Sequence, residues 1–187
     1  MRVAYQGGPG AFSESAARQA LGDAIECLPC RTFIDVAEAV RSGTAERGVL
    51  PLSNRIAGVV TEARAALAAG GLEVMSEIEL PIEPCLLVLS GGSLAAVRRV
   101  ISHPVALAQC GRFLAAHPAI EAAPFWDTAD AAREVAERRD PALAAIAGRA
   151  AADRYGLSVA VPGVGDRPDN ATRFAIVGRG LSGRRAW

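Results

Sequence analysis

Three polar segments lie at the ends of predicted β-strands and carry side chains that can bind a small anionic molecule. They are Ser53-Asn54-Arg55, Ser102-His103-Pro104 and Asn170-Ala171-Thr172-Arg173. Hydroxyl, carboxamide and guanidinium groups supply hydrogen-bond donors for carboxylates. Because ligands of open α/β sheets bind at the carboxyl ends of strands, we expect the three segments to meet in one cleft. The sequence therefore predicts a site for a carboxylate-bearing metabolite.

The composition excludes several classes of function. The 20 basic residues are all Arg, and they balance 20 Asp and Glu, so the net charge is zero. This balance provides no strongly basic face, and we expect neither nucleic acid nor a membrane as a partner. The absence of Lys removes Schiff-base catalysis and phosphate binding by a P-loop from the possible mechanisms.

The cysteines and apolar segments indicate a reducing compartment and no metal. No apolar run is long enough to span a bilayer, and the first residues lead directly into a strand pattern, so we expect a cytoplasmic protein. The cysteines are Cys27, Cys30, Cys85 and Cys110. We expect reduced thiols. The first two form a C-x-x-C pair, for which a metal or redox role is the alternative; a closed zinc site needs four ligands, and the chain has only two histidines.

Short β-like runs alternate with helical patterns along the chain, which is typical of an α/β fold with largely parallel strands. Residues 2–5 predict a strand, and a glycine-rich loop at 7–10 leads into a helix at 12–21. Such a turn offers backbone N–H groups to an anion. Further helices are predicted after Thr32, at 60–69, at 94–99 and at 105–115.

Extended segments at residues 72–80 and 84–89 separate two groups of α/β units. We therefore predict two lobes with a cleft between them. The predicted boundaries are 1–79 for the first lobe, 80–160 for an inserted second lobe and 161–180 for the return to the first. Residues 181–187 are expected to be a basic tail.

Several short motifs occur in order along the chain. They are Ala4-Tyr5 through Gly10-Ala11-Phe12-Ser13, Gly48-Val49-Leu50-Pro51-Leu52 with Asn54, Leu80-Pro81-Ile82, Ser102-His103-Pro104 followed by Ala106-Leu107-Ala108-Gln109-Cys110, Tyr155-Gly156-Leu157, and Asn170-Ala171-Thr172-Arg173-Phe174. Together they resemble the prephenate dehydratase family over nearly the whole chain, and the last motif is the most specific. The resemblance implies a two-lobed architecture like that of periplasmic binding proteins.

The resemblance also implies an activity, the conversion of prephenate to phenylpyruvate, water and carbon dioxide on the route to phenylalanine. This lyase reaction needs positioning and proton donation, so no cofactor or metal is expected. Thr172 matches the catalytic threonine of the family and is the predicted proton donor. Its alternative is a threonine that begins a strand because of its β propensity.

Further site residues follow from the resemblance. Asn54, Ser102 and Gln109 match polar positions of the family's cleft, where they hydrogen-bond the carboxylates or the pyruvyl oxygen. By residue type alone they are a turn former, a helix N-cap and a mid-helix polar residue. Since alternate residues of a strand face opposite ways, Arg173 either binds a carboxylate or braces the lobe. Phe174 either lines a pocket for the substrate ring or packs in the core.

Two departures from the family pattern concern specificity and regulation. Ser53-Asn54-Arg55 stands where the family usually has Glu-Asn-Ser or Glu-Asn-Thr. Arg55 either lies on the surface or faces the cleft and binds an additional anionic group. The chain also stops soon after the strand of Thr172, so we expect no C-terminal ACT regulatory domain and no inhibition by phenylalanine through it.

Several alternatives stay open at the level of the sequence. Arogenate is a possible substrate in place of prephenate, and a prephenate decarboxylase of specialised metabolism resembles the same family without aromatising the ring. A non-catalytic two-lobed binding module is the alternative of another class, because hinged α/β clefts also bind solutes. By analogy with similar small domains, we expect a homodimer.

Overall fold

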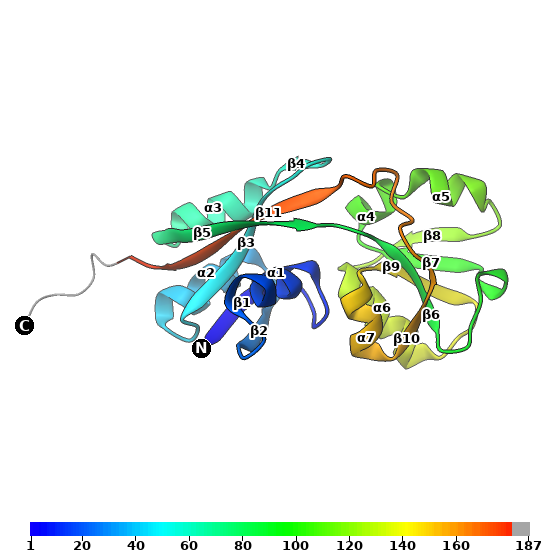
Figure 1. Cartoon of the computed structure of the whole chain (residues 1–187), viewed down its shortest axis with the longest axis horizontal. Coiled ribbons are helices and arrows are strands. Elements are labelled where there is room, and N and C mark those ends of the chain that lie inside the picture. The colour runs from blue at the N-terminus through cyan, green and yellow to red at the C-terminus, as the bar shows by residue number, and fades with distance from the viewer. Residues whose placement is uncertain (181–187) are drawn as a thin grey trace, which may run out of the picture. The chain divides into compact units, whose positions relative to one another are not determined.

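The computed structural model describes residues 1–180, so the tail predicted at 181–187 lies outside the described residues. The chain divides into two compact units (Figure 1). Of the described residues, the first unit contains Met1–Gly7, Ser13–Leu80 and 171–180, and the second contains Gly8–Phe12 and Pro81–Asn170. Each unit combines helices with a central sheet, as the sequence predicts.

The first unit is built on a sheet with the strand order β2-β1-β3-β11-β5, with β4 paired to β3. Its strands are β1 (Arg2–Gln6), β2 (Glu26–Cys30), β3 (Arg47–Asn54), β4 (Gly58–Val59), β5 (Leu72–Pro81) and β11 (Ala171–Arg179). Its helices are α1 (Phe12–Leu21), α2 (Phe33–Ser42) and α3 (Thr61–Ala69). β1 runs parallel to β2 and β3, whereas β11 returns antiparallel to β3.

Helices cover both faces of this first sheet. α2 and α3 pack on the face that carries Ala4 of β1 and Ala175 of β11. Tyr5 points to the opposite face because side chains alternate along a strand, and its hydroxyl donates to Glu14 of α1 at 3.3 Å. The apolar side chains buried on the two faces hold β3 and β11 in a rigid sheet.

Local signals in the sequence set the two ends of α2. The Thr32 hydroxyl accepts from Asp35 N at 3.1 Å, and the Asp35 carboxylate accepts from Thr32 N at 3.0 Å. This capping box satisfies backbone donors that have no partner within the helix. Gly43 ends the helix in the left-handed conformation, with φ of 84°. The helix therefore begins and ends where its capping residues predict.

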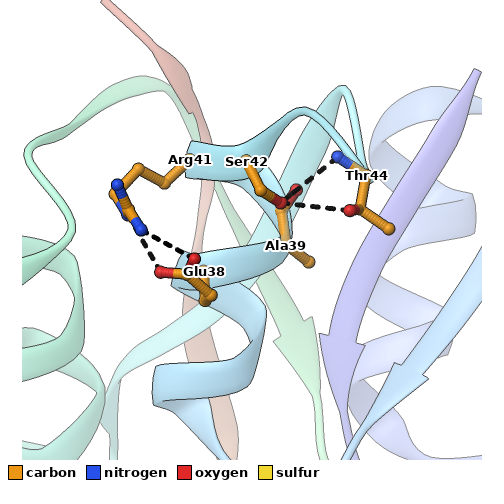
Figure 2. A network of polar contacts seen from close by, with 5 residues as sticks. All are labelled: Glu38, Ala39, Arg41, Ser42 and Thr44. Carbon is orange, nitrogen blue, oxygen red and sulfur yellow. Dashed lines mark hydrogen bonds and ion pairs between the residues drawn. The ribbon is translucent and has the colours of Figure 1, made fainter.

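A polar network surrounds the carboxyl end of α2, as Figure 2 shows. Arg41 pairs with Glu38 at 2.7 Å, and the Ser42 hydroxyl lies 3.0 Å from the Thr44 hydroxyl. The Arg41 and Glu38 side chains are more than half exposed, and exposed ion pairs contribute little to stability. We assign this network to the helix end and not to a binding site.

The second unit is built on a sheet with the strand order β10-β6-β9-β7-β8. Its strands are β6 (Cys85–Leu89), β7 (Arg99–Ser102), β8 (Glu121–Pro124), β9 (Leu143–Ala147) and β10 (Leu157–Val161). Its α-helices are α4 (Pro104–Ala108), α5 (Gly111–Ala116), α6 (Thr128–Arg138) and α7 (Arg149–Tyr155). β7 runs parallel to β8 and β9, and β6 runs antiparallel to β9 and β10. Both sheets are thus mixed. The expected largely parallel pairing is wrong because β11 runs against β3 in the first sheet and β6 runs against both of its neighbours in the second.

Two apolar cores lie on the two faces of the second sheet. On one face, Val135 of α6 and Ala151 of α7 pack with Leu87 of β6. On the other face, the residues around α4 and α5, including Cys110, pack with Ile146 of β9. Both cores are made of fully or almost fully buried side chains. The carboxyl ends of β7 and β9 are therefore fixed between two helical layers.

Some local expectations differ from the structure. The helix predicted at 94–99 is a single 3-10 turn, Leu94–Ala96. The helix predicted at 105–115 is two helices, α4 and α5. They are separate because Asp166 accepts from Gly111 N at 3.0 Å and so provides a new helix start. The sequence pattern also does not predict β2, which contains Pro29, or the short helix α7.

The chain returns to the first unit at Ala171, whereas the sequence places this return at residue 161. Residues 162–170 remain in the second unit because their backbone is bonded to it. Val164 N donates to Pro84 O at 2.9 Å, and Asp166 N donates to Gln109 O at 2.7 Å. Residues 162–170 therefore join no sheet, and strand pairing resumes with β11 at Ala171.

Residues Gly8–Phe12, which follow β1, belong to the second unit. Gly8 N donates to the buried carboxylate of Asp127 at 3.0 Å. Gly10 has φ of 90°, and a Cβ at this position would lie 2.8 Å from Ala151 Cα, so only glycine fits. Ala11 N donates to Gly8 O at 3.1 Å. The N–H groups of Gly8 and Ala11 thus have acceptors within the protein.

The cysteines give no support to the metal or redox alternative. Cys27 and Cys30 lie three residues apart on β2 and so face opposite sides of the strand. All four cysteines are free, and burial raises the pKa of the Cys27 and Cys30 thiols. Within residues 1–180, no three His, Cys, Asp or Glu side chains gather in a metal-binding arrangement. No described helix has the length and apolar character needed to cross a bilayer.

The Asp127 anchor predicts a dependence of stability on pH. Burial raises the pKa of this carboxyl, although hydrogen bonds from Asp130 N and Gly8 N oppose the shift. A carboxyl whose folded-state pKa is raised contributes stability that is present below its unfolded-state pKa of about 3.9 and is lost as the pH rises through the folded-state value. We expect the free energy of unfolding of Asp127→Asn to increase relative to that of the wild type as the pH rises through this window. Urea denaturation at a series of pH values measures this difference, and a difference that stays constant across the window would contradict the prediction.

Candidate active site

The pairing of β3 with β11 places Asn54 opposite Thr172. Asn54 Nδ2 donates to Thr172 Oγ1 at 2.9 Å and to Ala171 O at 3.2 Å. Thr172 is 7% exposed. The hydroxyl oxygen of Thr172 therefore accepts a hydrogen bond from a neighbour, and its proton is directed toward a different acceptor.

A turn after β3 fixes the orientation of the Asn54 carboxamide. Its Oδ1 accepts from Ile56 N at 3.0 Å and from Ala57 N at 2.8 Å. Arg55 N donates to Ala171 O at 2.8 Å, which extends the bonding to β11 by one residue. Since the acceptor end of the carboxamide is bound to the backbone, the donor end faces Thr172.

The two arginines near this pair are bound to acids of β5. Arg55 lies 2.5 Å from Glu79, and Arg173 lies 3.4 Å from Glu77. All four side chains are at least 40% exposed, so each ion pair is solvated and weak. Arg173 points away from the Thr172 face of β11, as strand alternation predicts. The structure thus places Arg173 against Glu77, and a role in substrate binding stays a prediction for both arginines.

Phe174 lies on the same face of β11 as Thr172. It is 2% exposed and therefore belongs to the interior of the first unit. The pairing between β3 and β11 shifts register between Arg173 and Phe174, where Phe174 pairs with Pro51. Such an irregularity changes the local direction of a strand, and here it lies next to the Asn54–Thr172 pair.

Ser102 lies at the end of β7 in the second unit and is fully buried. Its hydroxyl donates to Ile146 O at 2.5 Å, which ties β7 to β9. Helix α4 is capped instead by His103, whose Nδ1 accepts from Val105 N at 3.2 Å. Reading Ser102 as the N-cap is therefore wrong, and its proposed contact with substrate stays a prediction.

Gln109 ends α4 and is half-buried. Its Oε1 accepts from Asn170 Nδ2 at 3.2 Å. The next residue, Cys110, is buried, and burial raises the pKa of its thiol to about 12, with the charge of Asp166 adding to the effect. This thiol is therefore protonated at neutral pH.

The sequence does not predict which side chains bind and orient the candidate site residues. Asn170 is a member of the last motif, but nothing in its residue type indicates that it binds Gln109. Glu77 and Glu79 alternate along β5, which is an ordinary strand pattern. The sequence predicts a helix capped by Thr128, whereas the N-cap is Asp127, whose side chain accepts from Asp130 N; nothing in the sequence indicates its bond to Gly8.

The structure combines a two-unit α/β fold with a buried hydroxyl, that of Thr172, which accepts a hydrogen bond from the Asn54 carboxamide. A family model described as "Prephenate dehydratase" matches residues 3–181. The chain belongs to the prephenate dehydratase family.

Curated relatives support this assignment along most of the chain. Arogenate dehydratase 5, a chloroplastic protein of Arabidopsis thaliana, is 40% identical over 96% of this chain and 42% of its own length. A bifunctional chorismate mutase/prephenate dehydratase of Neisseria gonorrhoeae is 36% identical over 98% of this chain and 51% of its own length. The chain thus spans about half the length of these relatives.

Solved structures show the same fold. A prephenate dehydratase from Arthrobacter aurescens in complex with L-Phe has a TM-score of 0.88 and 33% identity, covering 96% of this chain and 61% of its own. A protein described as a novel type of quorum quenching acylase has a TM-score of 0.86 and 36% identity, covering 100% of this chain and 66% of its own. The methionine-binding protein MetQ shares the fold alone, with a TM-score of 0.52 and 11% identity, so the architecture is like that of substrate-binding proteins.

The bonds of Asn54 predict its contribution to stability. Asn54→Ala removes acceptors from Ile56 N and Ala57 N and donors from Ala171 and Thr172, and we expect the free energy of unfolding to fall by about 2 kcal/mol. Its neighbour Ser53 is the control. Ser53→Ala should change the free energy of unfolding by less than about 0.5 kcal/mol. Urea denaturation of both variants tests the assignment, and equal losses would show that the Asn54 side chain does not hold the turn.

Proposed function

We propose that the protein is a dehydratase that converts prephenate to phenylpyruvate, water and carbon dioxide. One observation carries the proposal. The Thr172 hydroxyl, buried on β11, accepts a hydrogen bond of 2.9 Å from Asn54 Nδ2. Membership of the prephenate dehydratase family supports the proposal, because the reaction for which the family is named needs one proton donor, and Thr172 can supply it.

The reaction balances without a cofactor. The bond between the ring and its carboxylate breaks, carbon dioxide leaves, and the electron pair enters the ring. The C4–O bond then breaks as the ring becomes aromatic, and the leaving hydroxide takes a proton to become water. The protein has to hold the substrate in the reactive geometry and deliver that proton.

Thr172 and Asn54 divide this work between them. The Thr172 hydroxyl donates its proton to the leaving oxygen, and solvent later restores it. Because Asn54 Nδ2 already faces Oγ1, it stabilises the negative charge that develops there during the transfer. Hydrogen bonds in series also polarise one another, so the bond from Asn54 makes the hydroxyl a better donor.

The substrate's oxygen atoms need donors, and Gln109 is the one whose arrangement best supports that role. It is half-buried and has a fixed side-chain partner. Ser102 would have to become accessible, and Arg55 and Arg173 would have to exchange their partners on β5. The proposal therefore assigns substrate binding first to Gln109, with these three residues as secondary candidates.

Two other activities are worth testing beside this one. Arogenate carries an amine where prephenate carries a keto group, and the relatives include enzymes named for each substrate. Amide hydrolysis is the second candidate because of the structural match to a quorum quenching acylase. It requires a general base near the hydroxyl, and the neighbour seen here is a carboxamide, which is not basic. We therefore favour the dehydratase.

We also propose that the protein works in the cytoplasm and as a homodimer. Four free cysteines are typical of a reducing compartment. Val74 and Met75 are both exposed on β5, the last strand of the first sheet, and a second copy would cover them.

The Thr172 hydroxyl is the group to remove. We expect Thr172→Ala to lower kcat for prephenate by about 10²- to 10⁴-fold, because general acids contribute rate factors of this size. Thr172→Ser keeps the hydroxyl and should retain most of the wild-type kcat. Thr44→Ala removes an exposed hydroxyl of the same unit and should leave kcat unchanged. Phenylpyruvate measured by its ultraviolet absorbance in alkali gives the rates, and full activity of Thr172→Ala would refute the mechanism.

A further inference from the structure

Gln109 is held firmly through its backbone. Asp166 N donates to Gln109 O at 2.7 Å. The Asp166 carboxylate accepts from Gly111 N at 3.0 Å and from Arg112 N at 2.8 Å. One residue thus binds the end of α4 and the start of α5, and Gln109 lies in the short connection between them. Its Cα position is therefore fixed, and only the side-chain torsions remain to be set.

Asn170 binds the side chain of Gln109. Asn170 is 3% exposed, and its Nδ2 donates to Gln109 Oε1 at 3.2 Å. The Asn170 carbonyl accepts from Ile82 N at 2.9 Å, so two extended segments of the second unit hold the residue in place. A buried donor in a fixed position selects the orientation of the carboxamide that it contacts.

The orientation of a carboxamide decides which kind of ligand atom it binds. The group has an acceptor end and a donor end of nearly the same shape, and rotation of its last torsion exchanges them. Because Asn170 binds Oε1, the NH₂ end of Gln109 is the end that faces away from Asn170. An NH₂ end attracts the oxygen of a carboxylate or ketone, whereas a carbonyl end repels it.

We propose that Asn170 is a positioning residue that fixes Gln109 as a hydrogen-bond donor for an oxygen of the substrate. This inference rests on the proposed dehydratase function and gives Asn170 a role separate from proton transfer by Thr172. Asn54 shows the same principle in the first unit, where backbone N–H groups bind its Oδ1 and turn its NH₂ toward Thr172. At Gln109 the orienting group is a side chain, so it can be changed by mutation.

The test inverts the orientation with a substitution of the same size. In Asn170→Asp the carboxylate accepts from the Gln109 NH₂ and turns the Gln109 carbonyl outward. We expect KM for prephenate to rise by about tenfold or more, since a charged ligand loses a hydrogen bond and meets a repulsive oxygen. We expect kcat to change by less than about twofold, because Thr172 is untouched. Asn170→Ala removes the donor without imposing the inverted orientation, so KM should rise less.

Two further variants keep the test independent of folding. Gln109→Glu leaves the donor of Asn170 in place but presents a carboxylate oxygen, and it should raise KM as Asn170→Asp does. In a Gln109→Ala background, the uncharged change Asn170→Ala should raise KM no further, because both changes act through one group. The control is Asp169→Asn, which breaks the exposed pair with Arg167 next to Asn170 and should leave KM unchanged.

The possible results separate this inference from the proposed function. A KM of Asn170→Asp equal to that of the wild type would overturn the role of Asn170 and leave the proposed dehydratase activity intact. The same holds if Asn170→Ala raises KM as much in the Gln109→Ala background as it does in the wild type. If the role of Asn170 were only structural, its variants would have a lower thermal midpoint, and the KM of the folded enzyme would be unchanged. This result too would overturn the role of Asn170. A wild-type protein that does not consume prephenate would overturn both proposals.

Discussion

The antiparallel pairing of β11 with β3 is the constraint on which the contact between Asn54 and Thr172 depends. It places Thr172 opposite Asn54, and these residues come from segments 118 positions apart in the chain. A slip of one residue in this register would turn the Thr172 side chain to the other face of the sheet. The register shift lies beside this pair, and the turn at Ile56 and Ala57 holds the Asn54 carboxamide that donates to the Thr172 hydroxyl.

A second feature is that the protein fixes the orientation of two side-chain carboxamides. Asn54 is oriented by two backbone N–H groups, and Gln109 is oriented by Asn170. In both cases the acceptor end is bound by the protein. Such fixed donors stabilise developing or existing negative charge without reorganising during the reaction. This arrangement suits a chain without lysine, whose arginines near the pair are bound to glutamates of β5.

The sequence predicts those parts of the structure that depend on local signals. The capping box at Thr32 and the α/β alternation are such signals, and the motif that contains Thr172 identifies the family. Long-range contacts are different, because neither partner carries a mark of the other. The bonds from Gly8 to Asp127 and from Asn170 to Gln109 join residues 119 and 61 positions apart. For the same reason the burial of Ser102 under Ile146 and the late return of the chain at Ala171 require the structure.

The central claim is that one buried hydroxyl supports a coupled loss of carbon dioxide and water. Carbon-13 NMR of prephenate labelled in the ring carboxylate and in the side chain, followed with the purified protein at neutral pH, tests it most directly. The account predicts labelled carbon dioxide or bicarbonate and labelled phenylpyruvate in equal amounts, with no other product. Labelled carbon dioxide accompanied by a non-aromatic acid would contradict it and would indicate a decarboxylase.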